Sequence, residues 1–147
     1  MRITRYTCGV LATVGILLIL PSFAGPRKPE SKGIPWLRSM VQAKKRAAKM
    51  GKPILADYYA EWCPPCKEML ATTYKDKAVI ERAKRFVPVL IDIDKDEKDA
   101  NAAGIEAVPT VVFYNSKGKE ILRSTGYHDA KTFLALMAEA EKKAKNR

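Results

Sequence analysis

Two cysteines separated by two prolines lie between an apolar run and a helix-forming segment. The apolar run is residues 53–60 (PILADYYA), and the cysteines are Cys63 and Cys66 within residues 61–67 (EWCPPCK). Two thiols at this spacing can close a short disulfide, and the positive end of a following helix favours the thiolate, the reactive form of cysteine. A strand, a CxxC pair and a helix in this order predict a dithiol redox site. We expect Cys63 to be the attacking sulfur and Cys66 the resolving one.

The cysteine pair has two other interpretations, a metal site and a purely structural disulfide. A structural zinc site takes four Cys or His ligands, and the remaining candidates in the chain are Cys8 and His128. A structural disulfide across so short a loop would restrict the unfolded chain little and would stabilise the fold weakly. Both stay open as alternatives, but the strand and the helix on either side of the pair favour redox chemistry without a metal.

Several separated segments resemble the thioredoxin superfamily and occur in that family's order between about residues 35 and 140. These segments are residues 56–63 (ADYYAEWC), 91–94 (IDID), 104–110 (GIEAVPT), 111–114 (VVFY) and the turn 115–119 (NSKGK). Within the superfamily, residues 36–53, 66–69 (CKEM) and 72–74 (TTY) are most similar to the periplasmic C-terminal domain of the disulfide reductase DsbD and to related exported single-domain proteins. Together these segments are far more specific than the CxxC pair alone.

The resemblance implies an α/β fold and a class of reaction. The fold would be thioredoxin-like, a central mixed β-sheet flanked by helices, in a single domain over residues 34–147. The reaction would be disulfide exchange with protein substrates, with the disulfide between Cys63 and Cys66 as the redox centre and no metal or organic cofactor. Pro109 matches the family's cis-proline, beside which the backbone of Val108 would pair with a substrate main chain.

Asp57 matches the buried acid that, in relatives, assists deprotonation of the resolving thiol. A carboxylate in an apolar strand is costly when charged, so a raised pKa and a role in proton transfer are expected. Leu90 stands where thioredoxins often have a lysine that accompanies this acid. A proton relay in this chain must therefore work through Asp57 and water.

The residues beside and between the cysteines are assigned to the substrate-binding surface. Trp62 would frame the dithiol with a flat contact surface, together with Pro64 and Pro65. Because proline has no backbone N–H, the amide of Cys66 is the nearest donor to the Cys63 thiolate, and stabilisation of that thiolate should be modest. The pKa of Cys63 should then be nearer the ~7 of thioredoxin than the ~3.5 of the oxidant DsbA.

The first 24 residues have the pattern of a secretory signal peptide. Arg2 and Arg5 give the positive region, residues 9–20 the apolar region, and residues 22–24 (SFA) a small-residue cleavage site. An uncleaved membrane anchor is the alternative, because residues 6–26 carry no charge. Residues 25–33 read as a linker rich in Pro, Lys and Gly. The sequence therefore predicts a periplasmic or otherwise extracytoplasmic domain.

The chain is strongly basic, which bears on its partners. Its formal net charge is +11, and it becomes +9 without residues 1–24, which contain two arginines and no acid. Much of this charge lies in residues 44–52 and 142–147, in the pattern of solvated helix faces. These runs contain no interleaved aromatics or recognition motif, so nucleic acid is not expected as a partner. Attraction to anionic lipid headgroups or to an acidic protein is the better functional alternative.

Hydrophobic periodicity predicts the order of the elements. We expect a helix over 35–50, a strand over 54–60, helices over 64–72 and 76–85, a central strand over 86–92, a short helix over 98–103, two strands joined by a turn at 117–118, and a last helix capped by Asp129. One face of the first helix would carry Trp36, Leu37, Met40, Val41, Ala47 and Ala48. His128, next to the last helix, is expected at the surface.

The prediction for function is an exported thiol-disulfide oxidoreductase, a dithiol reductant or electron relay that reduces protein disulfides through Cys63 and Cys66. Its partners would be protein disulfide substrates and a membrane-embedded electron donor, and we expect a monomer. One alternative is a disulfide-forming oxidase or isomerase. Another is a noncatalytic module that binds a thiol-bearing client during assembly of a haem protein.

Overall fold

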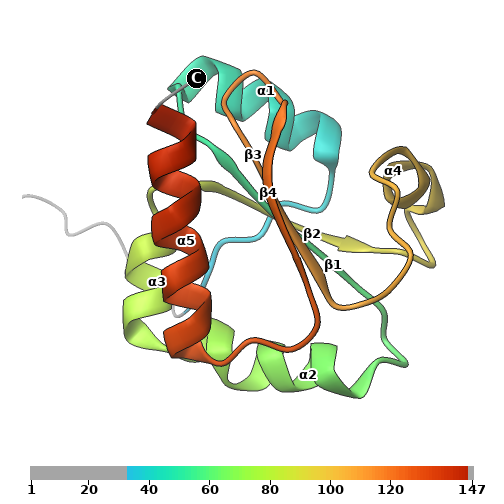
Figure 1. Ribbon diagram of the computed structural model, residues 1–147. Helices are drawn as coiled ribbons and strands as arrows, with labels where there is room; N and C mark the ends of the chain where they lie inside the picture. The colour runs from blue at the N-terminus through green and yellow to red at the C-terminus, as the bar shows by residue number, and fades with distance from the viewer. Residues whose placement is uncertain (1–32, 146–147) are drawn as a thin grey trace, which may run out of the picture. The chain divides into compact units, whose positions relative to one another are not determined.

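Four strands and the helices around them make up the part of the chain that the structure describes, residues 33–145 (Figure 1). In this computed structural model the strands are β1 (Ile54–Tyr59), β2 (Val87–Asp92), β3 (Thr110–Tyr114) and β4 (Glu120–Thr125). The helices are α1 (Met40–Met50), α2 (Pro64–Ala71), α3 (Lys77–Ala83), α4 (Glu97–Ala102) and α5 (Ala130–Lys145), with a 3₁₀ turn η1 (Thr73–Lys75) after α2. The predicted signal peptide and residues 25–32 of the predicted linker lie outside the described residues.

The strands form one mixed sheet in the order β2-β1-β3-β4. Strand β1 pairs in parallel with β2 and antiparallel with β3, and β4 pairs antiparallel with β3. A parallel pair needs a crossover connection, and α2, η1 and α3 supply it between β1 and β2. This arrangement confirms the predicted mixed sheet flanked by helices in a single domain.

Alternate residues of β1 pack against helices on opposite faces of the sheet. Ile54, Ala56 and Tyr58 are buried in a cluster with residues of α1 and α4. Leu55 is buried on the other face, against residues of α2, α3 and α5. Each fully buried aliphatic side chain of this kind contributes about 1.5–3 kcal/mol to folding. The face under α2 is the one that carries the redox residues.

Helix α1 begins later than the sequence predicts. Ser39 is extended, with φ −143°, and its side chain accepts a hydrogen bond from the backbone N–H of Gln42, so the helix starts at Met40 and not at Pro35. Of the predicted apolar face, Met40 and Ala47 are buried, whereas Ala48 is exposed and Val41 is 59 % exposed; Ala43, which the prediction does not assign to that face, is buried. The prediction that Trp36 and Leu37 belong to this helix is wrong, because tertiary contacts hold them in an extended segment.

Strand β2 lies at the end of the four-stranded sheet and not at its centre, where the sequence places it. Its outer edge is nevertheless covered by the chain before α1. The Leu37 N–H donates to the Pro88 carbonyl and the Leu90 N–H donates to the Leu37 carbonyl, both at 3.0 Å. This single parallel bridge satisfies edge groups that would otherwise be unpaired, and every residue of β2 is buried.

Candidate active site

Cys63 and Cys66 form a disulfide at the start of α2, with their Cα atoms 5.3 Å apart. Cys63 is the N-cap of the helix, and Pro64 and Pro65 fill its first two positions, where a missing N–H costs little. The backbone N–H of Cys66 points at Cys63 Sγ, with N and S 3.3 Å apart. Both cysteines are 2 % exposed, so a substrate must approach through the surface around them.

Apolar residues from three segments pack against the disulfide. Ala60 belongs to the same buried cluster as the cysteines, and Tyr59, Ile93 and Val108 pack against it. The peptide bond between Val108 and Pro109 is cis, immediately before β3. The fold thereby brings Val108 and Pro109, more than forty residues later in the sequence, next to the cysteine pair.

Trp62 presents a flat apolar face to solvent directly before Cys63. Its side chain is 65 % exposed, and its indole Nε1 donates to Asp94 Oδ2 at 2.8 Å. The same loop holds Lys95, which forms ion pairs with Asp92 at 2.9 Å and with Glu61. These contacts connect the segment before the cysteines to the loop after β2 and fix the edge of the indole while its face stays free.

Asp57 lies on β1, two residues before Tyr59 and on the same face of the sheet as α2. It is 2 % exposed, and burial raises the pKa of its carboxyl from 3.8 to about 7, with the Tyr74 hydroxyl partly opposing that rise. Tyr74 is held edge-to-face between the rings of Trp36 and Phe133, with centroids 5.1 and 5.2 Å away. Within the described residues, neither Asp57 Oδ1 nor Tyr74 Oη has a hydrogen-bond partner of standard geometry.

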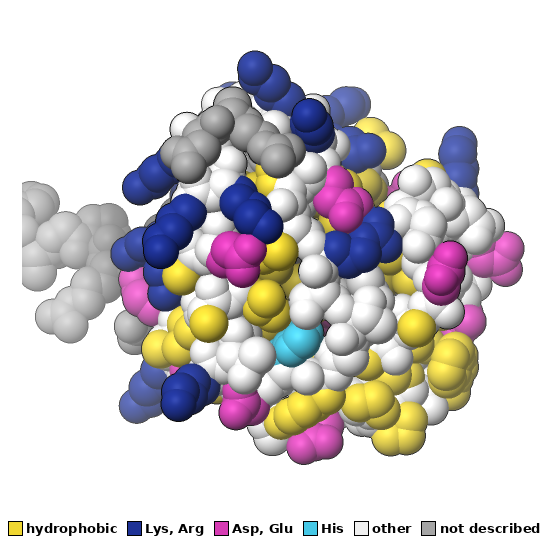
Figure 2. All heavy atoms as spheres, viewed as in Figure 1, with side chains coloured by type: hydrophobic (Ala, Val, Ile, Leu, Met, Phe, Trp, Pro, Cys, Tyr) yellow, Lys and Arg dark blue, Asp and Glu magenta, His cyan; other side chains and the backbone are white. Residues whose placement is uncertain are grey.

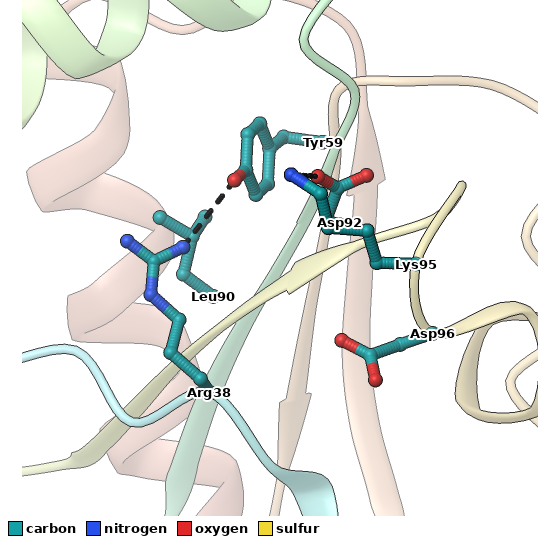
Figure 3. Close-up of a pocket in the computed structure, with 6 residues that line it drawn as sticks. All are labelled: Arg38, Tyr59, Leu90, Asp92, Lys95 and Asp96. Carbon is teal, nitrogen blue, oxygen red and sulfur yellow. Dashed lines mark hydrogen bonds and ion pairs between the residues drawn. The ribbon is translucent and has the colours of Figure 1, made fainter.

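A hollow of about 370 Å³ opens beside Tyr59 at the β2 edge of the sheet (Figure 3). It is lined by Arg38, Tyr59, Leu90, Asp92, Lys95 and Asp96. The guanidinium of Arg38 donates to the Tyr59 hydroxyl at 3.3 Å across the hollow. Leu90 pairs with Asp57 in the register of β1 and β2, so the sheet places an apolar side chain, and no lysine, next to the acid.

Tyr127 is a residue of this region that the sequence analysis missed. The N–H of Gly126 donates to the Pro109 carbonyl at 2.8 Å, which brings the β4–α5 loop to the segment after Val108. Tyr127 is 42 % exposed there, a large apolar side chain left in solvent. Nothing in the sequence before the last helix indicated that Tyr127 lies near the cysteine pair. Only the hydrogen bond between Gly126 and Pro109 shows that the two loops are close together.

His128 is buried, and the prediction that it lies at the surface is wrong. It is 9 % exposed, its carbonyl accepts a hydrogen bond from the Thr73 hydroxyl at 2.7 Å, and burial lowers the pKa of its imidazole. Packing of η1 against the start of α5 encloses it.

Residues 33–145 contain no group of three or more His, Cys, Asp or Glu side chains that could hold a metal ion. In the same part of the chain, no helix is long and apolar enough to span a bilayer.

Comparisons with known proteins agree with this geometry. Residues 40–141 match the family model of the thioredoxin-like domain. The thiol:disulfide interchange protein DsbD of Pectobacterium atrosepticum is 35 % identical over 94 residues, which is 60 % of this chain and 16 % of that protein. DsbD of Ralstonia nicotianae is 28 % identical over 123 residues, 77 % of this chain and 20 % of that protein. The chain therefore spans a fifth or less of the length of these relatives.

A solved structure shows the same fold. The solution structure of a thioredoxin from Thermus thermophilus has a TM-score of 0.68 to this chain at 23 % sequence identity, over 76 % of this chain and 89 % of that one. At this identity the likeness concerns the arrangement of the helices and strands.

Proposed function

Because this chain belongs to the thioredoxin-like domain family, we propose that it is an exported dithiol reductant or electron relay that reduces protein disulfides through Cys63 and Cys66. The observation that carries the proposal is the cysteine pair in the first turn of α2, packed against Val108 and next to the exposed face of Trp62. The pair itself is the redox centre, and the reaction uses no further cofactor.

The reaction transfers two electrons from the dithiol to a substrate disulfide. The Cys63 thiolate attacks one substrate sulfur, forms a mixed disulfide and releases the other substrate sulfur as a thiol. Cys66 then loses its proton and attacks Cys63 Sγ, which releases the second substrate thiol. The product on this chain is the Cys63 to Cys66 disulfide seen in the structure.

Asp57 is proposed as the group that takes the proton of Cys66 in the second step. A pKa of about 7 suits that role, because an acid with a pKa near the working pH can accept a proton and return it. The carboxyl lies on the face of the sheet covered by α2, the helix that carries Cys66. Tyr74 acts on the acid through its hydroxyl and is a positioning residue in this scheme.

The substrate-binding surface is proposed to surround the disulfide on three sides. Trp62, Pro64 and Pro65 form one side, and Val108 with Pro109 forms the second. The main chain of Val108 would pair with an extended segment of the substrate, as in β-strand addition. Tyr127 extends this surface on the third side, since its loop is bonded to Pro109.

Export and electron supply complete the proposal. Residues 1–24 would direct the chain out of the cytoplasm and be cleaved, with an uncleaved anchor as the alternative, and residues 25–33 would be a linker. A membrane-embedded donor would reduce the disulfide again after each turnover. We propose that the domain acts as a monomer.

The test combines an insulin-reduction assay with trapping of mixed disulfides. The wild-type chain should reduce insulin with dithiothreitol as electron source. Cys66→Ser should accumulate a mixed disulfide with a disulfide-containing client, because its attacking sulfur is intact, whereas Cys63→Ser should accumulate none. Equal trapping by both variants would contradict the assigned roles.

The same assays separate the alternative functions. A noncatalytic client-binding module would give no turnover of insulin. An oxidase or isomerase would reduce insulin poorly but would oxidise or rearrange a reduced, scrambled substrate in a glutathione buffer. Either result would overturn the reductant assignment.

A further inference from the structure

Exposed basic side chains gather at one end of the domain. They are Lys44, Lys45, Arg46 and Lys49 of α1, Lys117 and Lys119 in the turn between β3 and β4, and Lys142 and Lys145 at the end of α5. We call this set the basic end. The turn lies against α1, since a Cβ added at Gly118 would be 3.8 Å from carbons of the Lys44 side chain. Figure 1 shows α1, this turn and the end of α5 at the top of the domain.

The positive charge of the basic end is not neutralised by neighbouring acids. The carboxylates of β4 and α5 at this end are already paired: Glu120 with Arg123 at 2.8 Å, Glu139 with Lys143 at 2.7 Å, and Glu141 with Arg82 and Arg85 at 3.0 and 3.2 Å. In the described part of the chain, no side chain of the basic end forms an ion pair. The basic end therefore produces a strong positive field over a broad surface.

Helix α1 adds an exposed apolar side chain to this surface, because Met50, at the end of the row of lysines, is 49 % exposed. Val41, at the other end of α1, is 59 % exposed but lines a hollow with the acidic residues Asp96, Glu97 and Asp99, so it is not counted in the basic end. Basic helices that also expose apolar residues are typical of protein surfaces that lie on anionic bilayers. The exposed aromatic side chains that could stack on nucleic-acid bases, Trp62 and Tyr127, belong to the surface around the disulfide and not to the basic end.

The disulfide lies at the other end of the domain. In Figure 1 the start of α2 is at the lower right, away from α1 and from the end of α5. Figure 2 shows dark-blue side chains along the top of the molecule, with others down its left side and at its upper right, and yellow side chains along its lower right edge. A surface bound at the basic end would therefore leave Cys63 and Cys66 open to substrates.

We propose that the basic end docks the domain on membranes rich in anionic lipid, with the disulfide facing away from the bilayer. Each lysine near such a surface changes the partition coefficient about fivefold, so several of them acting together bind strongly at low ionic strength. Docking of this kind is independent of the redox reaction, and either proposal can fail while the other stands.

The experiment measures co-sedimentation of the full chain with vesicles made of equal parts phosphatidylcholine and phosphatidylglycerol. The test variant replaces Lys44, Lys45 and Lys49 of α1 by glutamine. A matched control replaces Lys75 of η1, Lys77 at the start of α3 and Lys131 at the start of α5, all exposed, by glutamine. Both variants lose the same charge and keep the same N-terminal segment, so a difference between them reports the place of the charge.

We expect the α1 variant to bind these vesicles on the order of a hundredfold more weakly than the wild-type chain, and the control variant to lose much less. Binding should fall at about 1 M salt, where charges are screened within about 3 Å. Equal losses in the two variants would overturn the proposal, as would wild-type binding that is as strong to pure phosphatidylcholine. A wild-type chain that bound polyglutamate but not the anionic vesicles would point instead to an acidic protein partner and would also overturn it.

A second measurement tests the orientation. Dithiothreitol should reduce the Cys63 to Cys66 disulfide equally fast in free and in vesicle-bound protein, because the basic end and not the redox surface contacts lipid. Protection of the disulfide on anionic vesicles would contradict the orientation. Both triple variants should reduce insulin at the wild-type rate, which confirms that they are folded.

Discussion

The buried carboxyl of Asp57 should make the stability of this protein depend on pH in an unusual direction. Burial raises its pKa from 3.8 to about 7 in the folded chain. Between these two pH values the folded protein keeps a proton that the unfolded chain has released. The unfolded state then binds fewer protons, so the free energy of unfolding falls as pH rises. The destabilisation is absent below about pH 4 and fully present above about pH 7.

Its magnitude follows from the difference in pKa. One pKa unit corresponds to about 1.4 kcal/mol, so the difference of about three units amounts to about 4 kcal/mol. That is a large part of the 5–15 kcal/mol by which a typical domain is stable. Replacing Asp57 by asparagine removes the charge and keeps the shape of the side chain. Asp57→Asn should therefore be about 4 kcal/mol more stable than the wild-type protein at pH 8 and of similar stability at pH 4.

The assay is guanidinium chloride unfolding of the disulfide form at intervals from pH 4 to pH 8, with stabilities compared as differences between the two proteins. Other groups also titrate over this range, since burial lowers the pKa of His128 and a backbone hydrogen bond lowers that of Asp129. Their contributions are common to both proteins and cancel in the difference. Burial raises the pKa of Tyr74 well above 10, so that hydroxyl stays neutral throughout.

Glu106→Gln is the matched control, because Glu106 is an exposed carboxylate in the loop before β3. Its stability should follow the wild-type curve within about 0.5 kcal/mol at every pH. A difference between Asp57→Asn and wild type that stays constant from pH 4 to pH 8 would refute the reasoning. A constant difference would mean that the carboxyl of Asp57 is charged from pH 4 to pH 8. Such a charge would need stabilising groups that the structure does not place around it.

Two further predictions concern residues next to the redox centre. Pro65→His restores a backbone N–H in the first turn of α2, where the Cys66 amide is the donor to Cys63 Sγ, and should lower the pKa of Cys63 by about one unit and raise the reduction potential by about 30 mV. Thiolate absorbance titration and equilibration in glutathione buffers check both values, and no change in either would show that backbone donors do not control this thiolate. Tyr74→Phe keeps the ring between Trp36 and Phe133 but removes the hydroxyl that favours the charged carboxyl, so the pKa of Asp57 should rise by about half a unit. The pH dependence of insulin reduction should then move to higher pH, and a move to lower pH would contradict this role.

Local chemistry made much of the redox site predictable from the sequence. Proline fits the first positions of a helix, so residues 63–66 had to put the cysteine pair at a helix start, and α2 begins at Pro64. Asp129 was expected to cap the last helix, and its carboxylate accepts from the Thr132 N–H at 2.8 Å. The turn between β3 and β4 and the apolar run of β1 also follow from residues close together in the chain.

The tertiary structure decided the features that depend on distant partners. Pro35 to Ser39 could have been helical by local preference, but Leu37 completes the edge of β2 and holds this segment extended. The nearly continuous apolar residues of β2 indicate that the strand is buried. They do not indicate whether a full neighbouring strand or a short bridge pairs with its outer edge. The burial of His128 likewise comes from the packing of η1 against the start of α5.

The same division holds for the chemistry of the site. The sequence by itself determined which groups are present: two thiols, an acid in an apolar strand, a tryptophan beside the pair and many lysines. Only the tertiary structure decided that the acid faces Tyr74 without a standard hydrogen bond, that Tyr127 lies near Pro109, and that basic side chains of α1, of the β3–β4 turn and of the end of α5 share one end of the domain. Burial, hydrogen bonding and the clustering of charges depend on distances in space. For residues far apart in the sequence, those distances are set only when the sheet and the helices pack together.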